Sequence, residues 1–328
     1  MKLLVLSHTE VVELLPIKDC IAVMREALTA LAAGKVHQPL RTIIRPPDAK
    51  GVMGLMPCYK SGDAAAFGLK AICVFPGNPA KGIDSHQGAV LLFSAETGEL
   101  LAMMNASAIT AIRTAAISGV ATDLLARVDA GNLAIIGSGV QARAHLVAMS
   151  HVRFIKRCRI ASRHIEHARK FAEEMRPDFS FALEPVETIE EALDGADLIV
   201  CATNAVEPIV RREWISVGAH LNVVGSSTPN AREVDSETMA AASLFVDRRE
   251  STLNEAGDYL FAARDGVIGP SHIRAEIGEV LKGDKPGRTS PDEITLFKSL
   301  GLATSDLFAG EHVYRRAKES NVGTWVEF

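Results

Sequence analysis

The spacing of apolar residues over the first hundred positions predicts one helix followed by a sheet. Ser7-x-x-Glu10 forms a capping box, and apolar residues recur at helical spacing from Ile17 to Ala33. Short β-rich segments separated by Gly, Pro and Asp come next, with a hairpin expected around Thr97-Gly98. This pattern predicts a mainly antiparallel sheet. The expected strands are LRTIIRP, GVMGLMPCY, AFGLKAICVF and GAVLLFSAETGELLAMMN.

The pattern changes again after the sheet region. Residues 106–126 are helical in spacing, and from Asn132 onward apolar strands alternate with helical segments, which predicts a doubly wound parallel sheet. The stretch from Asp292 returns through a strand to an amphipathic helix, and the tail VGTWVEF could add a strand to the N-terminal sheet. The expected parallel strands are NLAIIG, RCRIAS, FSFAL, ADLIVCAT, AHLNVVG and ASLFVD.

The fold class is therefore α/β, with a Rossmann-type doubly wound parallel sheet inserted into an α+β domain. Residues 116–302 are expected to form the nucleotide-binding domain. Residues 1–115 and 303–328 are expected to form a substrate domain from both ends of the chain. A length of 328 residues is consistent with two domains of unequal size.

Composition narrows the class of protein. Hydrophobic residues make up 48% and charged residues 23%, and no apolar run is long enough to predict a membrane-spanning segment. A net charge of −5 without a basic stripe argues against nucleic acid as a partner. No small-residue cleavage site follows the apolar N-terminus, so a cytoplasmic protein is expected. The five cysteines are scattered and lack C-x-x-C spacing, which predicts reduced core thiols and no metal site.

A glycine-rich stretch follows the first strand of the alternating region. Gly137-Ser-Gly139-Val140-Gln141-Ala142 stands between the apolar strand NLAIIG and a helix. In a βαβ unit the first glycine allows a tight turn, the second lets the backbone approach a diphosphate, and the small third residue lets helix and strand pack closely. The free amides at the start of the helix would then bind the diphosphate. This context predicts a dinucleotide site.

The next strand favours NADPH over NADH as the coenzyme. It ends in Ser162 and Arg163, where an NAD site usually has an acidic residue for the ribose hydroxyls. A guanidinium can bind a 2′-phosphate through forked charged donors, and a carboxylate would repel it. NADH stays possible, because Arg is common at strand ends and an acidic residue could come from elsewhere.

Three cations lie in otherwise apolar segments of the first domain. They are Arg41, Lys70 and Arg113. Charged side chains are seldom buried unless they are paired, so these three suggest a pocket for a carboxylate, although each could also extend outward to solvent. The segment SHQG, which includes Gln87, precedes the next expected strand and could add polar groups or simply form a turn.

The order of several motifs resembles that of the ornithine cyclodeaminase and mu-crystallin family over nearly the whole chain. Members of this family include cyclodeaminases, alanine dehydrogenases and reductases of cyclic ketimines, so the resemblance is specific to the family rather than to one reaction. The motifs are GLKAICVFPGN, SHQGAVLLFSAETGELLA, ITAIRTAA, IIGSGVQARAH, VGSSTPNAREVD and DEITLFKSLGLATSD.

The resemblance implies a homodimer joined through the N-terminal sheet and an active site between the domains. It implies that Arg41, Lys70 and Arg113 hold a substrate carboxylate, with Lys70 as proton donor, and that Met56 helps to set the pocket volume. Further residues are implied to contact the coenzyme. They are Arg113, Thr114, Thr203, Val224, Ser226, Lys298 and Ser299.

Ser227 separates the activities within this family. Cyclodeaminases and alanine dehydrogenases of the family typically carry an Asp two residues after Gly225, whereas this chain has a serine, as ketimine reductases do. A cyclodeaminase must handle a free amine and benefits from a carboxylate base. A reductase that receives a ready-made ring imine needs a carboxylate clamp, a hydride and one proton.

The sequence therefore predicts an NADPH-dependent reductase of a cyclic ketimine carboxylate, with Lys70 and Ser227 as catalytic residues. The expected reaction converts Δ1-pyrroline-2-carboxylate or Δ1-piperideine-2-carboxylate to L-proline or L-pipecolate. The alternatives are an ornithine cyclodeaminase, then an alanine-type dehydrogenase, then a non-catalytic binding protein similar to mu-crystallin.

Overall fold

The computed structural model describes residues 2–328 and divides them into two compact units. Of the described residues, unit 1 comprises 2–113 and 302–328, and unit 2 comprises 114–301. The sequence placed these boundaries at 115/116 and 302/303, whereas the structure places them at 113/114 and 301/302. The first boundary falls inside a single long helix, α3 (Ala106–Leu125), which explains why no turn residue marks it in the sequence.

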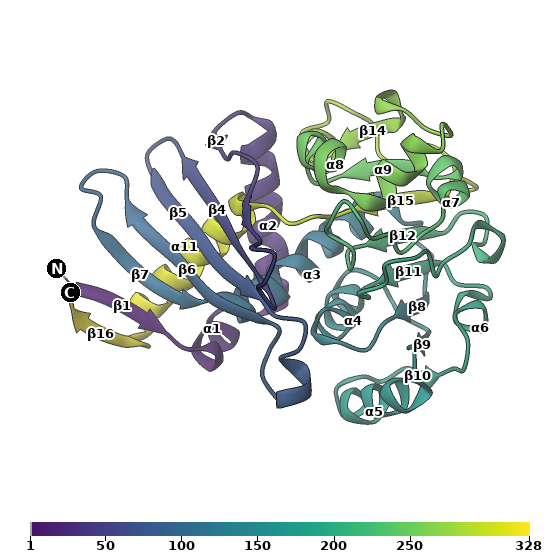
Figure 1. Cartoon of the computed structure of the whole chain (residues 1–328), viewed down its shortest axis with the longest axis horizontal. Helices are drawn as coiled ribbons and strands as arrows, with labels where there is room; N and C mark the ends of the chain where they lie inside the picture. The colour runs from purple at the N-terminus through teal and green to yellow at the C-terminus, as the bar shows by residue number, and fades with distance from the viewer. Residues whose placement is uncertain (1) are drawn as a thin grey trace. The chain divides into compact units, whose positions relative to one another are not determined.

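Unit 1 is built on an eight-stranded sheet (Figure 1). Seven of its strands follow the order β16-β1-β7-β6-β5-β4-β2, and the eighth, β3, pairs with β4. All pairs are antiparallel except β1 with β7. The C-terminal strand pairs with β1, as the tail pattern predicted. The strands are β1 (Lys2–Leu6), β2 (Val36–His37), β3 (Thr42–Ile44), β4 (Val52–Lys60), β5 (Ala66–Val74), β6 (His86–Ser94), β7 (Leu100–Asn105) and β16 (Thr324–Glu327).

One face of this sheet is covered by helices. The long C-terminal helix α11 (Ala303–Ser320) packs on β4, β5 and β6 and against α2 (Ile17–Ala32), while the short α1 (His8–Leu14) begins with the predicted Ser7–Glu10 capping box. Close packing of α11 depends on Gly68 of β5, where an added Cβ would lie 3.0 Å from the Leu307 side chain. The helix is therefore held tightly over the middle of the sheet.

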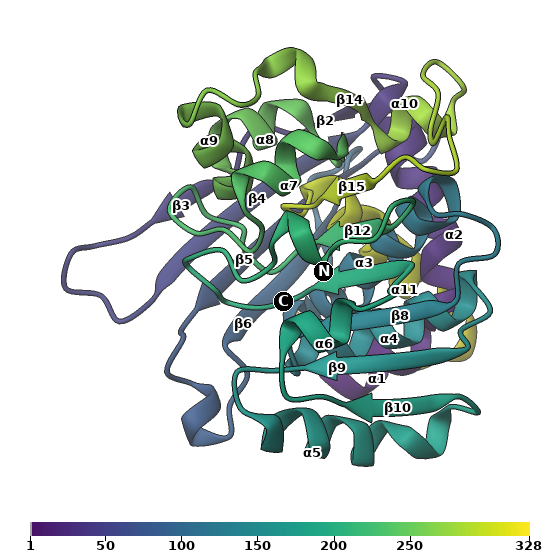
Figure 2. The same cartoon turned by 90° about the vertical axis from the view of Figure 1, so that its right-hand side faces the viewer.

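Unit 2 is built on an eight-stranded parallel sheet with the order β10-β9-β8-β11-β12-β15-β13-β14. Figure 2 labels six of these strands: β10, β9, β8, β12, β15 and β14. Strands β8, β11, β12 and β15 are buried along almost their whole length, as expected for a parallel sheet covered on both faces. The bounds are β8 (Asn132–Ile136), β9 (Arg157–Ala161), β10 (Ala182–Pro185), β11 (Leu198–Cys201), β12 (His220–Val223), β13 (Ser243–Val246), β14 (Ile273–Glu276) and β15 (Thr295–Lys298).

Unit 2 confirms the doubly wound parallel sheet and adds the strand β14, which the sequence pattern did not predict. This four-residue strand contains Arg274 and Glu276, so it lacks the continuous apolar run of its neighbours. The helices are α4 (Val140–Val152), α5 (Ile165–Met175), α6 (Ile189–Leu193), α7 (Ser236–Ala241), α8 (Arg249–Glu255), α9 (Gly257–Arg264) and α10 (Ile277–Leu281).

Among the described residues, one helix is long and apolar enough to be tested as a membrane span. This helix is α3, and 72% of its most apolar window is buried inside the protein. Core helices of globular proteins can have the same length and composition, and the burial of α3 is that of such a helix.

Candidate functional site

Three charged side chains from remote parts of unit 1 form one buried cluster. Lys70 Nζ on β5 lies 2.8 Å from Asp306 Oδ2 on α11, and Arg113 Nε on α3 donates to Asp306 Oδ1 at 2.9 Å. The exposed fractions are 3% for Lys70, 3% for Arg113 and 1% for Asp306. Because one carboxylate faces two cations, the cluster keeps a net positive charge and can bind an anion.

Burial changes the acidity of Lys70. Desolvation lowers the pKa of its ammonium group to about 8, the nearby Asp306 opposes this shift, and Arg113 and Arg41 add to it. Near this pH both the charged and the neutral form are populated, so Lys70 can give or take a proton. The Arg113 Nη1 atom is buried and finds no hydrogen-bond partner among the described residues, which leaves it able to bind an anion.

The structure brings two further predicted residues to this cluster. Met56 pairs directly with Lys70 in the β4–β5 register, so both side chains lie on the same face of the sheet. The apolar context of Arg41 suggested a position inside a strand, but Arg41 directly precedes β3. Its positive charge still acts on the cluster, because it lowers the pKa of Lys70. All three predicted cations therefore lie in one electrostatic neighbourhood.

The structure does not bring Gln87 to the cluster. The expected turn SHQG is instead the start of β6, where Gln87 pairs with Cys73. Because side chains alternate along a strand, Cys73 and Gln87 lie on the opposite face of the sheet from Lys70. The neighbouring residue His86 lies on the same face of the sheet as Lys70. Together with desolvation, the charges of Lys70 and Arg113 lower the pKa of its ring.

The glycine-rich loop of unit 2 has the geometry of a dinucleotide site. Gly137 follows β8 with φ 117°, and a Cβ there would lie 2.5 Å from the carbonyl oxygen of Ala202. Gly139 is the N-cap of α4 and makes no side-chain cap, and a Cβ on it would meet open space. Ala142 is fully buried between helix and sheet. The first amides of α4 therefore face a space that can accept a diphosphate.

Other predicted coenzyme residues surround this loop at the carboxyl ends of the strands. Ser162 follows β9, and its hydroxyl lies 2.9 Å from that of Ser138 in the glycine-rich loop. Arg163 is exposed beside it. Val140 is 53% exposed at the start of α4, next to the half-buried Gln141.

A buried carboxylate that the sequence did not point to holds two of these strand ends together. Glu233 Oε1 accepts from the Thr203 backbone N–H at 2.7 Å and from the Thr203 hydroxyl at 2.8 Å. Its Oε2 accepts from the N–H groups of Gly225 at 2.7 Å and Ser226 at 3.3 Å. Burial raises the pKa of Glu233. The four donors nevertheless favour the ionised carboxylate, because a proton on either oxygen would face an N–H or O–H donor. Glu233 therefore fixes the loops that follow β11 and β12.

Lys298 and Ser299, predicted to approach the nicotinamide, have side chains that are engaged inside unit 2. Lys298 Nζ lies 2.7 Å from Asp258 Oδ2 and donates to the Ser226 carbonyl oxygen at 2.5 Å, and it is fully buried. The Ser299 hydroxyl donates to Asp247. The Lys298 ammonium therefore supports the loop after β12 from within, and it does not serve as an exposed ligand group.

Thr114, Val224 and Ser226 were also predicted to contact the coenzyme. Thr114 is 8% exposed in α3, Val224 is 9% exposed, and Ser226 is 3% exposed with a hydroxyl that has no partner among the described residues. Ser227, half-buried, follows at the end of the same loop. Val224 and both serines stand at the carboxyl edge of β12.

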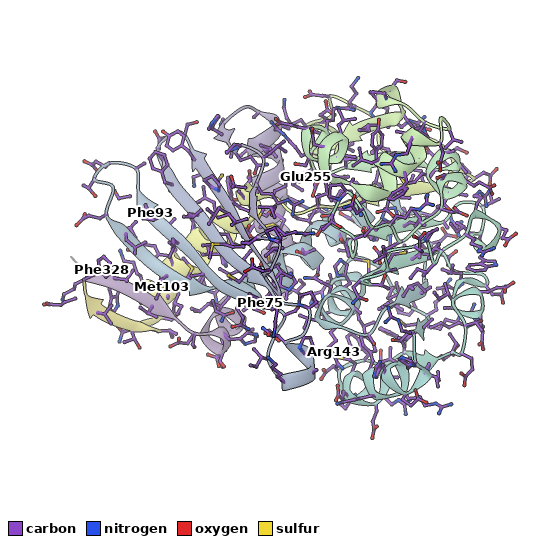
Figure 3. All side chains as sticks on the ribbon, viewed as in Figure 1. Phe75, Phe93, Met103, Arg143, Glu255 and Phe328 are labelled. Carbon is purple, nitrogen blue, oxygen red and sulfur yellow. The ribbon has the colours of Figure 1, made fainter. Side chains whose placement is uncertain are left out.

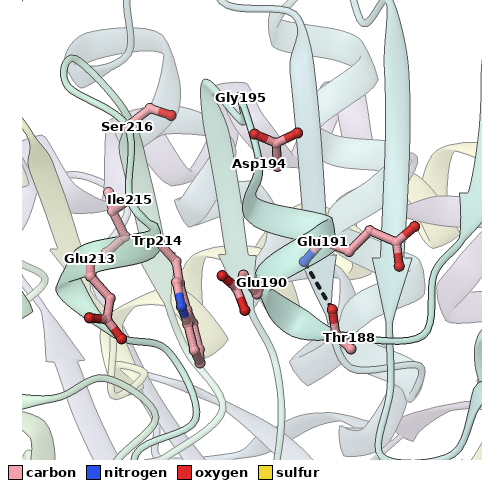
Figure 4. Close-up of a pocket in the computed structure, with 9 residues that line it drawn as sticks. All are labelled: Thr188, Glu190, Glu191, Asp194, Gly195, Glu213, Trp214, Ile215 and Ser216. Carbon is pink, nitrogen blue, oxygen red and sulfur yellow. Dashed lines mark hydrogen bonds between the residues drawn. The ribbon is translucent and has the colours of Figure 1, made fainter.

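A shallow groove in unit 2 lies at the opposite edge of the sheet. Its lining residues, drawn in Figure 4, come from α6 and from the segment before β12. Both segments lead into the amino ends of strands, α6 into β11 and the second segment into β12. Its lining carries four carboxylates and no cation, which would repel a diphosphate. The lining residues are Thr188, Glu190, Glu191, Asp194, Gly195, Glu213, Trp214, Ile215 and Ser216. Ligands of open parallel sheets bind at the carboxyl edge, so the coenzyme site is not this groove.

These features define the class of protein as a dinucleotide-binding α/β protein with a buried cationic site for an anion. The family model described as the ornithine cyclodeaminase/mu-crystallin family matches residues 1–321, and the chain belongs to this family.

Several relatives with full-length or nearly full-length matches are reductases by name. The chain is 37% identical over 327 residues to a Delta(1)-pyrroline-2-carboxylate reductase of Bacillus cereus, covering 99% of this chain and 100% of the relative. It is 41% identical to the ketimine reductase mu-crystallin of Mus musculus over 281 residues, covering 86% and 85% of the two chains.

A solved structure supports the same assignment. A Thermococcus litoralis Delta(1)-pyrroline-2-carboxylate reductase in complex with NADH and L-proline is 41% identical, with a TM-score of 0.95 and coverage of 98% and 99%. An archaeal alanine dehydrogenase dimer with bound NAD is 34% identical, with a TM-score of 0.93 and complete coverage of both chains. The fold is therefore shared by enzymes with related but different reactions.

Proposed function

We propose that this chain is an NAD(P)H-dependent reductase of a cyclic ketimine carboxylate, converting Δ1-pyrroline-2-carboxylate or Δ1-piperideine-2-carboxylate to L-proline or L-pipecolate. The cluster of Lys70, Arg113 and Asp306 is the observation that carries this proposal. It offers a net positive charge for a carboxylate and an ammonium group with a pKa of about 8 as a proton source. The reductase names of the relatives agree with this chemistry.

The proposed reaction divides among the chain's own groups. When bound, the reduced nicotinamide supplies a hydride to the imine carbon and is itself oxidised. Arg113 and Arg41 neutralise the ring carboxylate and fix its orientation. Lys70 gives a proton to the ring nitrogen, so that one C–H bond and one N–H bond form as the C=N double bond becomes single.

The strand end at Ser162 and Arg163 supports NADPH as the preferred coenzyme. The exposed guanidinium of Arg163 can pair with a 2′-phosphate, and the Ser162 hydroxyl next to the glycine-rich loop can add a hydrogen bond. NADH can also bind such a loop, because the diphosphate contacts come from backbone amides.

Ser227 supports imine reduction over cyclodeamination. The loop that carries it follows β12, and Glu233 holds the backbone of Gly225 and Ser226 directly before it, which supports a role for position 227 at the carboxyl edge. A hydroxyl there can bond to a ring or to the coenzyme but cannot act as a carboxylate base toward a free amine. Ornithine cyclodeaminase is the second candidate function, and it depends on such a base.

The reductase proposal is tested by a substrate panel. We expect coenzyme oxidation with one or both cyclic imines, faster with NADPH than with NADH, and no ammonia release from ornithine. Ornithine, lysine and alanine serve as comparison substrates, and Ser227→Asp is assayed in parallel for new ornithine turnover. The proposal is contradicted if neither imine is turned over with either coenzyme. It is also contradicted if the parent enzyme releases ammonia from ornithine at a robust rate.

We also propose that the uncovered face of the unit 1 sheet joins two copies of the chain. The side chains opposite the helix-covered face are almost all apolar and cross the strands in register: Phe93 of β6 pairs with Phe67, which pairs with Tyr59, and Leu91 pairs with Met103. Phe67 and Met103 are 47% and 37% exposed, and Figure 3 labels Phe93 and Met103. An exposed apolar patch of this kind usually marks a protein interface, and a two-fold axis can place the same patch of a second copy against it.

Phe67→Asp is expected to convert a dimer into a monomer, because it places a charge in the middle of this apolar face. Light scattering coupled to size exclusion gives the molar mass. Phe154→Asp is the matched control, since Phe154 is 85% exposed in unit 2 and lies outside the patch. A Phe67→Asp protein that keeps twice the chain mass rules out this interface.

A further inference from the structure

We infer that Asp306 is a positioning residue for the reaction: it sets both the place and the protonation state of Lys70 while holding Arg113 in a fixed orientation. This inference rests on the proposed function, because it concerns how the same cluster transfers a proton. Neither the sequence pattern nor the names of the relatives assign a role to this carboxylate.

Among the residues that the structure describes, Asp306 is the one carboxylate that pairs with both cations. Its two oxygens are divided between them, with Oδ2 at 2.8 Å from Lys70 Nζ and Oδ1 at 2.9 Å from Arg113 Nε. The bond to Nε uses one edge of the guanidinium, while the buried Nη1 has no partner among the described residues. A substrate carboxylate can therefore bind Arg113 without displacing Asp306.

The backbone around Asp306 is fixed by contacts that do not involve the cluster. Asp306 lies in the first turn of α11, where the helix dipole favours a carboxylate. Gln38 Oε1 accepts from the Thr304 N–H at 2.8 Å and from the Thr304 hydroxyl at 2.6 Å, which anchors the start of the helix. Leu307, the next residue along α11, packs on Gly68 of β5. Asp306 can therefore hold the Lys70 ammonium group in one position.

The charges that face Lys70 come from four segments. Asp306 on α11 raises the pKa of Lys70, whereas Arg113 on α3 and Arg41 before β3 lower it. His86 on β6 interacts with both Lys70 and Arg113, and desolvation followed by these two charges lowers the pKa of its ring, with Asp84 opposing. Among these neighbours, Asp306 is the one that favours the protonated form of Lys70, so removing its charge lowers the pKa of Lys70 below about 8.

Asp306→Asn tests this role through the pH dependence of the reaction. In the reductive direction the wild-type rate falls as pH rises through the pKa of Lys70, because the proton donor is lost. In the variant this fall in rate is expected about one to three pH units below that of the wild type, which is the size of shift that loss of an adjacent opposite charge produces. Asp306→Ser, which is smaller and uncharged, repeats the test without adding bulk to the buried site.

Glu311→Gln is the matched control on the same helix. Glu311 pairs with Lys60 on β4 at 2.6 Å, so this variant removes an ion pair between α11 and the sheet without touching the cluster. Its pH profile is expected to match that of the wild type. A folded Asp306→Asn or Asp306→Ser protein with the wild-type pH limb, or a Glu311→Gln protein with the same shift, overturns the inference.

A second readout keeps this inference distinct from the proposed function. NMR of protein carrying ¹³C at the lysine Cε, with the Lys70 signal assigned by its loss in Lys70→Met, reports protonation of this buried lysine across pH without any substrate. The Lys70 signal is expected to titrate at lower pH in Asp306→Asn than in the wild type. If imines are not turned over but this shift occurs, the proposed function fails and the role of Asp306 stands. An unshifted titration curve rejects the role whatever the substrate.

Discussion

Lys70→Met is expected to lower kcat/KM for the cyclic imine by roughly 10³-fold or more, because it removes a general acid and one of the charges that bind the carboxylate. The methionine side chain is close to the lysine stem in length, so the buried space stays filled. Coenzyme affinity is expected to stay unchanged, since the glycine-rich loop lies in unit 2. Steady-state kinetics and a coenzyme titration measure the two effects.

The control for this variant is Lys60→Met. Lys60 also lies on the sheet of unit 1 and pairs with Glu311, another carboxylate of α11. A drop for Lys60→Met equal to that for Lys70→Met would show that the loss comes from weakened helix packing. Less than a tenfold loss for Lys70→Met would remove Lys70 from the reaction.

Glu233→Gln is expected to lower the free energy of unfolding by about 3–5 kcal/mol, because it removes a fully buried charge that accepts four hydrogen bonds. The amide group that replaces one oxygen is a donor and would face N–H or O–H groups of Thr203, Gly225 or Ser226. Both strand-end loops are then expected to loosen. Chemical denaturation gives the stability, and coenzyme titration is expected to show weaker binding.

Glu237→Gln is the matched control for this prediction. Glu237 is exposed on α7, four residues from Glu233, and its replacement is expected to change stability by less than about 0.5 kcal/mol. Equal stability of Glu233→Gln and the wild type would mean that the buried carboxylate does not hold the two loops together.

The fold was predictable to the extent that it follows from local periodicity. Apolar runs between helical segments gave β8 and β11 with small errors at their ends, because parallel strands covered on both faces need apolar residues at nearly every position. The strand β14 was missed because Arg274 and Glu276 interrupt its apolar pattern.

The site was predictable where a residue type was unusual in its own segment. Lys70 and Arg113 stood out as cations among apolar neighbours, but their shared partner Asp306 is 193 positions from Arg113 and lies in an amphipathic helix where an acid is ordinary. Glu233 lies in the loop between β12 and α7, where an acidic residue is equally ordinary. Tertiary pairing between distant segments leaves no local trace in the sequence.

Gln87 shows the opposite error. The sequence placed the segment SHQG before the expected strand, where it could add polar groups beside the cations or form a turn, yet β6 begins at His86. Once the residue belongs to a strand, alternation decides its face, and a shift of one position moves a side chain from the cluster to the other side of the sheet.

The most direct test of the central claim is the fate of the hydride. With Δ1-pyrroline-2-carboxylate and NADPH that carries deuterium at the transferable C4 position, we predict proline with a single deuterium at Cα and one coenzyme oxidised for each proline formed. A cyclodeaminase would instead make proline from ornithine with no net coenzyme consumption. An unlabelled product, or no reduction of either Δ1-pyrroline-2-carboxylate or Δ1-piperideine-2-carboxylate, would contradict the account.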